Sequence, residues 1–72
     1  MSYRNFEFVL AGMEKGKEST LELDLYNVCA YSIQEAISEV YIRMHSLRTH
    51  SGKDWKIVSA TDATHFDNIK KF

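Results

Sequence analysis

The chain has no proline, only three glycines and a single cysteine, Cys29, and it lacks an apolar run long enough to cross a bilayer. One cysteine cannot form an intramolecular disulfide, whereas secreted domains of this size usually carry several. The cytoplasm is therefore the expected location, and the segment "MSYRNFEF" shows no apolar region of a signal peptide. Without a Gly-rich or Ser-rich stretch there is no candidate linker, so we expect one domain over residues 1–72 and no membrane contact.

The chain does contain enough apolar material for one core. Of its 72 residues, 44% are hydrophobic, including four Phe, four Tyr and one Trp, which separates it from disordered chains. The net charge of −1 hides an asymmetry, because residues 1–39 hold three basic and seven acidic side chains (−4) and residues 40–72 hold six basic and three acidic ones (+3). Such a polarised surface could attract a charged partner, provided that the asymmetry survives folding.

Two segments alternate between apolar and polar side chains with the period of two that is typical of a β-strand. The first strand is expected over Tyr3–Ala11 and the second over Thr20–Val28, with a hairpin loop at the glycines of "GMEKGKE". The side chains predicted to face the core from these strands are Phe6, Phe8, Leu10, Leu21, Leu23 and Leu25.

A helix is expected after the second strand. Ser32 and Glu35 in "SIQEAI" form a capping box, which predicts a helix that begins at Ile33. Apolar residues then recur with the three-and-four spacing of a stripe that faces a core, at Ile33, Ala36, Ile37, Val40, Met44 and Leu47. Gly52 provides a left-handed stop just beyond this stripe.

The segment "WKIVSAT" returns to a β-rich composition and predicts a third strand that begins at Lys53 or Trp55 and ends at Thr61. Trp55 and Ile57 would face the core. In the tail, "THFDNIKKF" favours a short C-terminal helix over a strand. A right-handed crossover places the third strand beside the first, in the order 2-1-3 with antiparallel neighbours. The expected fold is therefore a two-layer α+β domain of ββαβ type, with one main helix on one face of a three-stranded sheet.

The face of the sheet away from the helix is the first candidate binding surface. The residues that the alternation places there are Glu7, Val9, Glu22, Asp24, Tyr26, Lys56, Val58 and Ala60. Val9 and Val58 would be neighbours at the centre, and the three acidic side chains would form a rim suited to a basic partner. Three alternatives stay open: the apolar residues of the tail fold over the valines, the face stays wet, or two copies of the chain pair through it.

The stretch "YIRMHSLRTH" concentrates basic and titratable side chains near the end of the helix. At roughly 100° per residue, Arg43 and Arg48 fall on opposite borders of the apolar stripe, so they do not form one clamp. His45 lies on the side of Arg48, and His50 lies on the side of Arg43. A pairing of Arg43 with Glu39 one turn earlier, and the negative end of the helix dipole, account for these residues without a binding role.

Two further contacts are predicted at this helix. Ile42 points away from the apolar stripe, and together with Tyr41 and His45 it would make a small contact for a protein partner. A less favoured alternative is phosphate binding at the end of the helix and the third strand, which would make the chain a nucleic-acid-binding domain. The residues of that alternative site are His45, Arg48, Lys53 and Lys56.

No motif fixes a reaction or a metal. A helical zinc pair needs histidines four residues apart, whereas His45 and His50 are five apart. Cys29, at the junction between strand and helix, is expected to be a small buried hydrophobe. The chain has neither a Gly-rich phosphate loop nor a serine elbow, so an enzyme is the least supported class and no cofactor is predicted.

The run "VCAYSIQEAI", followed by a helix and then "WKIV", resembles the strand–cap–helix–strand arrangement of small phage-encoded proteins, including anti-CRISPR and related anti-defence inhibitors. The resemblance spans Thr20 to Thr61. It implies an inhibitor that acts by occluding a surface of a larger protein, with no chemistry of its own. The predicted function is therefore a non-enzymatic protein-binding module.

Overall fold

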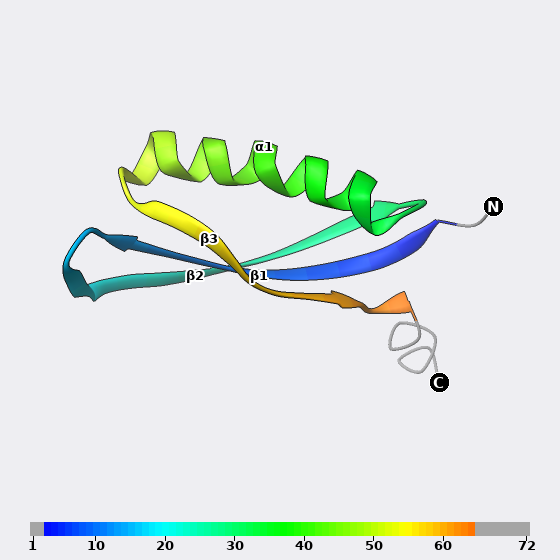
Figure 1. The fold of residues 1–72 in the computed structure, drawn as a ribbon, viewed down its shortest axis with the longest axis horizontal. Coiled ribbons are helices and arrows are strands. Elements are labelled where there is room, and N and C mark those ends of the chain that lie inside the picture. The colour runs from blue at the N-terminus through cyan, green and yellow to red at the C-terminus, as the bar shows by residue number, and fades with distance from the viewer. Residues whose placement is uncertain (1–2, 65–72) are drawn as a thin grey trace.

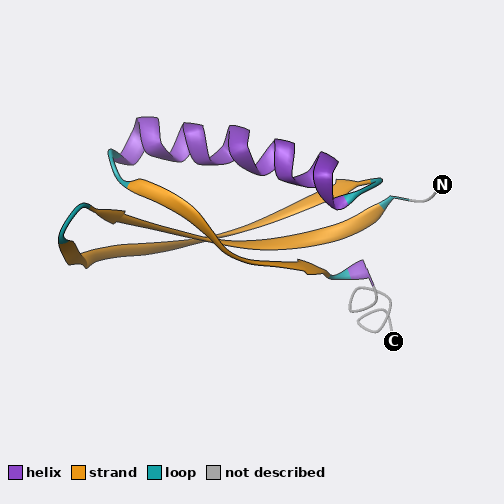
Figure 2. Cartoon of the chain, viewed as in Figure 1, coloured by secondary structure: helices purple, strands orange, loops and turns teal. Residues whose placement is uncertain are grey.

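In the computed structural model, which describes residues 3–64, three strands and one helix form two layers (Figure 1). The elements are β1 (Arg4–Glu14), β2 (Lys17–Ala30), α1 (Ile33–Ser51) and β3 (Asp54–Asp62). The sheet order is β2-β1-β3 with antiparallel neighbours, and α1 lies across one face only (Figure 2). The predicted ββαβ fold and strand order are confirmed, whereas the predicted tail helix falls on residues outside the described part.

Both helix ends form as the sequence predicts. Ser32 has an extended backbone, and its hydroxyl accepts a hydrogen bond of 3.2 Å from the backbone N–H of Glu35. At the other end, Gly52 adopts the left-handed conformation with φ of 71°, and its N–H donates to the carbonyl of Arg48 over 2.9 Å. These two caps give the helix 19 residues, which is long enough to cross the sheet from β2 to β3.

The hairpin between β1 and β2 is tighter than predicted. Glu14 pairs with Lys17, so Lys15 and Gly16 alone make the turn, and Gly16 has φ of 75°. Gly12, predicted to lie in the loop, is a buried residue of β1. The register shifts beyond Gly12, where the Thr20 hydroxyl accepts from the N–H of Glu14 over 2.8 Å and donates to the carbonyl of Lys17 over 2.6 Å. This hydroxyl satisfies backbone groups that the irregular pairing would otherwise leave unpaired.

The core lies between α1 and the helix-facing side of the sheet. Its buried members are Phe6, Phe8, Leu10, Val28, Ala30, Ala36 and Val40. Ala30 and Ala36 are almost fully buried where β2 passes into the helix, and their small side chains let the two backbones approach closely. Trp55 and Ile57 pack against the same core from β3, as predicted.

The three leucines of β2 face away from the core, so their predicted core role is wrong. Directly paired residues share a face of the sheet, and Val28 pairs with the buried Phe6. Leu25 instead pairs with Val9, and its side chain is 70% exposed. The side chains of β2 alternate between the two faces as predicted, but each set lies on the face opposite to the predicted one. The other side of β2, with Glu22, Asp24 and Tyr26, therefore faces the helix.

A bulge in β3 changes the faces of that strand. Val9 pairs with Ser59 and Leu10 with Ile57, so Val58 is the extra residue between them. Val58 follows the helix-facing Ile57 and points to the open face, as predicted. Beyond the bulge the phase is inverted. Ala60 pairs with the buried Phe8 and lies on the helix side, which corrects its predicted place on the open face.

Candidate functional site

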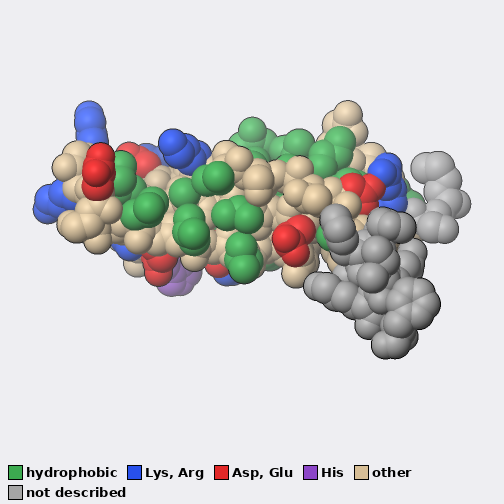
Figure 3. Space-filling view, turned by 90° about the horizontal axis from the view of Figure 1, so that it is seen from below, with side chains coloured by type: hydrophobic (Ala, Val, Ile, Leu, Met, Phe, Trp, Pro, Cys, Tyr) green, Lys and Arg blue, Asp and Glu red, His purple; other side chains and the backbone are tan. Residues whose placement is uncertain are grey.

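The open face of the sheet carries a row of apolar side chains that no described element covers. We call the following five residues the apolar strip: Val9, Leu21, Leu23, Leu25 and Val58. Their alignment follows from the pairing of Leu25 with Val9 and from the bulge that places Val58 beside them. Figure 3, which views this side of the molecule, shows hydrophobic side chains gathered over its middle. The predicted covering of this face by the tail falls on residues outside the described part.

The exposure of the apolar strip is unusual because its members are neighbours. Leu21, Leu23 and Val58 are 58%, 61% and 57% exposed. Single exposed leucines are normal on a protein surface, but three on one strand face beside two valines form a continuous patch. Contiguous patches of this kind are typical of protein interaction sites. The strip is therefore the strongest candidate site on the described part of the chain.

Charged side chains lie on the open face on both sides of the level of Val9. Glu7 is exposed on β1, two residues from Val9, and it is paired with Asn27 and Thr61. Lys56 is exposed on the other side of Val9, where it is paired with Ala11 and is therefore level with Leu23, the other partner of Ala11. Lys56 and Leu21 also line a hollow of about 350 Å³ beside the hairpin. An acidic and a basic side chain thus lie on opposite sides of the level of Val9, and Leu21 continues the strip beyond Lys56.

The predicted acidic rim of the open face is wrong for two of its three members. Glu22 and Asp24 lie on the helix side, because β2 is in the opposite phase. The Lys53 ammonium lies 3.2 Å from an oxygen of Glu22. Asp24 accepts two hydrogen bonds from Arg43, over 3.1 Å from Nε and 3.0 Å from Nη2. Of the predicted rim, Glu7 alone lies on the open face.

The pairing of Arg43 with Asp24 connects the helix to the edge of the sheet. The sequence predicted that Arg43 would pair with Glu39 along the helix, and its side chain instead reaches across to β2. There its guanidinium carbon lies 5.3 Å from the centre of the Tyr26 ring. The hydrogen bonds that Arg43 donates to Asp24 raise the pKa of Arg43 above its usual range. This geometry assigns a structural role to one of the arginines of "YIRMHSLRTH".

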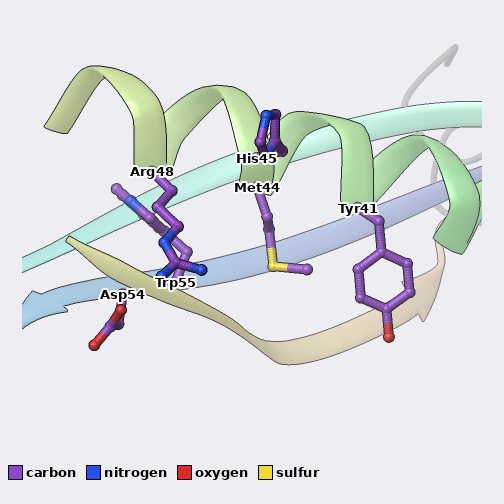
Figure 4. A pocket seen from close by; sticks show the side chains of 6 residues that line it. All are labelled: Tyr41, Met44, His45, Arg48, Asp54 and Trp55. Atoms are coloured by element: carbon purple, nitrogen blue, oxygen red, sulfur yellow. The ribbon is translucent and has the colours of Figure 1, made fainter. Parts of the chain in front are cut away.

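The second arginine lies in a shallow groove on the opposite side of the helix. The groove has a volume of about 310 Å³ and lies between α1 and the start of β3. Its lining residues are Tyr41, Met44, His45, Arg48, Asp54 and Trp55. In Figure 4 the side chains of Tyr41, Met44 and Arg48 extend toward β3, whereas His45 points away from it. The predicted separation of Arg43 and Arg48 onto opposite borders of the helix is confirmed.

The four residues of the alternative nucleic-acid site do not converge. His45 and Arg48 line the groove beside the carboxylate of Asp54. Lys53 is held by Glu22 on the helix side, and Lys56 lies on the open face. Affinity for nucleic acid depends on several cations that meet the phosphates together. The structure brings two of the predicted four to one place.

Ile42 lies on the outer side of the helix, as predicted, and is 66% exposed. Tyr41 and His45 are exposed beside it. Cys29 is exposed on the open face opposite Asn5, which corrects its predicted burial. Within residues 3–64, no group of three His, Cys, Asp or Glu side chains is placed to hold a metal ion.

The sequence does contain a pattern that indicates that the leucines of β2 face away from the helix. Val28 and Ala30 at the end of β2 are in phase with Tyr26 and out of phase with the leucines. Because these last residues lead directly into the helix, they must face it, and the phase of the whole strand follows from them.

Comparison of the chain with protein-family models, curated proteins and solved structures found no match. In the described part of the chain, no helix combines the length and the apolar character that a membrane span requires.

Proposed function

We propose that this chain is a small protein-binding module that acts through the apolar strip, by occupying a surface of its partner and without chemistry of its own. The observation that supports this proposal is the alignment of Leu21, Leu23 and Leu25, all more than half exposed, beside Val9 and Val58 on a face that no described element covers. A binding module that occludes a surface is also what the resemblance to small phage-encoded inhibitors implies. The exposed outer side of the helix around Ile42 is the second surface available to a partner.

The free energy available at the strip is large enough to support specific binding. Full burial of a Leu or Val side chain stabilises by about 1.5–3 kcal/mol, so covering the exposed parts of four strip residues contributes about 4–8 kcal/mol. Apolar groups of the partner contribute a similar amount. Together the two contributions exceed the cost of lost translational and rotational freedom on association, which is about 4 kcal/mol at the low end.

The test is capture of partners by the immobilised protein, with two matched variants. Leu25 and Ile42 are 70% and 66% exposed, on opposite sides of the molecule, so each tolerates a charge without loss of the core. We expect Leu25→Asp to abolish capture and Ile42→Asp to leave it unchanged. Circular dichroism establishes that both variants are folded. Capture that survives Leu25→Asp and fails with Ile42→Asp would move the binding surface to the helix and refute the proposal.

A further inference from the structure

We infer that the partner on the apolar strip is a second copy of this chain, packed face to face with its strands antiparallel to those of the first. The inference rests on the proposed function of the strip as a binding surface, and it adds the identity and orientation of the occupant. It is drawn from the distribution of charge on the open face, which is self-complementary.

Two charged side chains of the open face, Glu7 and Lys56, lie symmetrically about the level of Val9. Glu7 lies two residues from Val9 along β1, and Lys56, through its pairing with Ala11, lies two residues away in the opposite direction. Each is therefore displaced by about 7 Å along the strand from the level of Val9. A two-fold axis that crosses the strands at this level brings Glu7 of each copy to the level of Lys56 of the other.

This arrangement forms two ion pairs at once, because a two-fold interface repeats every contact. A two-fold axis parallel to the strands would instead place Glu7 over Glu7 on the central strand, and like charges across an interface disfavour association. Asp54 lies two residues beyond Lys56 on β3, farther from the axis, where it is paired with Met13. The charges thus select the antiparallel arrangement.

At the level where the two-fold axis crosses the sheet, the side chains on the open face of all three strands include apolar ones. Leu25 is paired with Val9, and the bulge places Val58 next to Val9 on the other side. Two open sheets that pack face to face keep their strands within about 30° of each other and interdigitate side chains across about 10 Å. In this geometry the leucine and the two valines of each copy meet their counterparts at the centre of the interface.

The size of the face sets the strength of the dimer. Three strands spaced by about 4.8 Å, over the length of β3 at about 3.4 Å per residue, make a flat area on the order of 400 Å². Standard stable interfaces bury about 800 Å² of accessible surface on each partner. The dimer is therefore at the small end of specific interfaces, and we expect it to dissociate at roughly micromolar concentrations.

The experiment is sedimentation equilibrium of the full-length chain from about 1 µM to about 1 mM. We expect the wild-type mass to rise from monomer to dimer across this range. Leu25→Asp should stay monomeric, and the matched control Ile42→Asp should follow the wild type. Glu7→Lys and Lys56→Glu should each weaken the dimer about tenfold or more, and the double variant, which restores opposite charges, should recover to within about threefold of the wild type.

A chain that stays monomeric at the highest concentration would overturn the dimer. The capture experiment with Leu25→Asp would then still decide whether a different protein uses the strip, so the two proposals fail separately. A dimer that persists in Leu25→Asp would place the contact elsewhere and also overturn the inference. A dimer that forms but is not recovered by the charge exchange would refute the antiparallel arrangement.

Discussion

The indole ring of Trp55 lies across Gly12, so closely that a Cβ added to Gly12 would come within 2.3 Å of the Cε2 atom of Trp55. The two residues are direct partners between β1 and β3. The indole N–H donates to the hydroxyl of Ser51 over 3.0 Å, which connects the end of the helix to the sheet. Trp55 also lines both the groove beside Arg48 and the hollow on the open face. Because Gly12 has no Cβ, the indole ring of Trp55 can lie against β1 and line both the groove beside Arg48 and the hollow on the open face.

We expect Gly12→Ala to lower the free energy of unfolding by about 2–3 kcal/mol, because the added methyl group overpacks the indole. Gly16→Ala is the control. A Cβ at Gly16 meets nothing within 4 Å, and its φ of +75° alone leads us to expect a loss of about 1 kcal/mol. Urea denaturation measures both. Equal losses in the two variants would contradict the close contact between Gly12 and Trp55.

The phase of β2 is testable by stability alone. Leu10 is fully buried and Leu25 is 70% exposed. We expect Leu10→Ala to lower the free energy of unfolding by about 2–5 kcal/mol, as is usual for a core leucine. At concentrations at which the proposed dimer would be dissociated, Leu25→Ala should change the free energy of unfolding by less than about 0.5 kcal/mol. A large loss in Leu25→Ala would restore the phase that the sequence predicted.

The elements of this fold are local, and local patterns predict them. Ser32 and Gly52 mark both ends of the helix because capping depends on the few residues around each end. The strand order follows from the handedness of the crossover, which holds for nearly all such connections. These features need no knowledge of which residues meet across the molecule.

The phase of a strand is not local. Alternation divides the side chains of β2 into two sets but does not say which set is buried, and the leucines are the more hydrophobic set. The helix side nevertheless takes Tyr26, Val28 and Ala30, whose size suits the close approach of α1. Asp24 is accommodated there by Arg43, a contact between residues 19 positions apart. The sequence therefore assigns the wrong members of β2 to the open face, and the bulge at Val58 has no sequence signal.

The contact between Asp24 and Arg43 provides a further prediction. Its side chains are partly exposed, so we expect Asp24→Asn to lower the free energy of unfolding by about 1 kcal/mol at low salt. Glu39→Gln removes the partner that the sequence assigned to Arg43 and should change stability by less than about 0.3 kcal/mol. Thermal unfolding at low and high salt measures both effects. A larger loss in Glu39→Gln would show that Arg43 pairs along the helix in solution.

Stability should also depend on Asp62 at acidic pH. Hydrogen bonds from the hydroxyl and the backbone N–H of Thr64 hold the pKa of Asp62 below its usual 3.8, and the nearby guanidinium of Arg4 acts in the same direction. A carboxyl whose pKa is lowered by folding stabilises the protein above its unfolded pKa. That contribution is complete above pH 3.8 and is lost as the pH falls below it.

The fall in urea midpoint below pH 3.8 should therefore be steeper in the wild type than in Asp62→Asn. Because Thr64 contributes more to the lowered pKa than Arg4, Thr64→Val should flatten the profile more than Arg4→Met. The Thr64 hydroxyl also accepts from the N–H of Asn5 over 2.8 Å, so Thr64→Val lowers the midpoint at neutral pH as well. The slope of the acid limb separates this constant loss from the titration. An unchanged slope in Thr64→Val would show that the ion pair with Arg4 determines the pKa of Asp62.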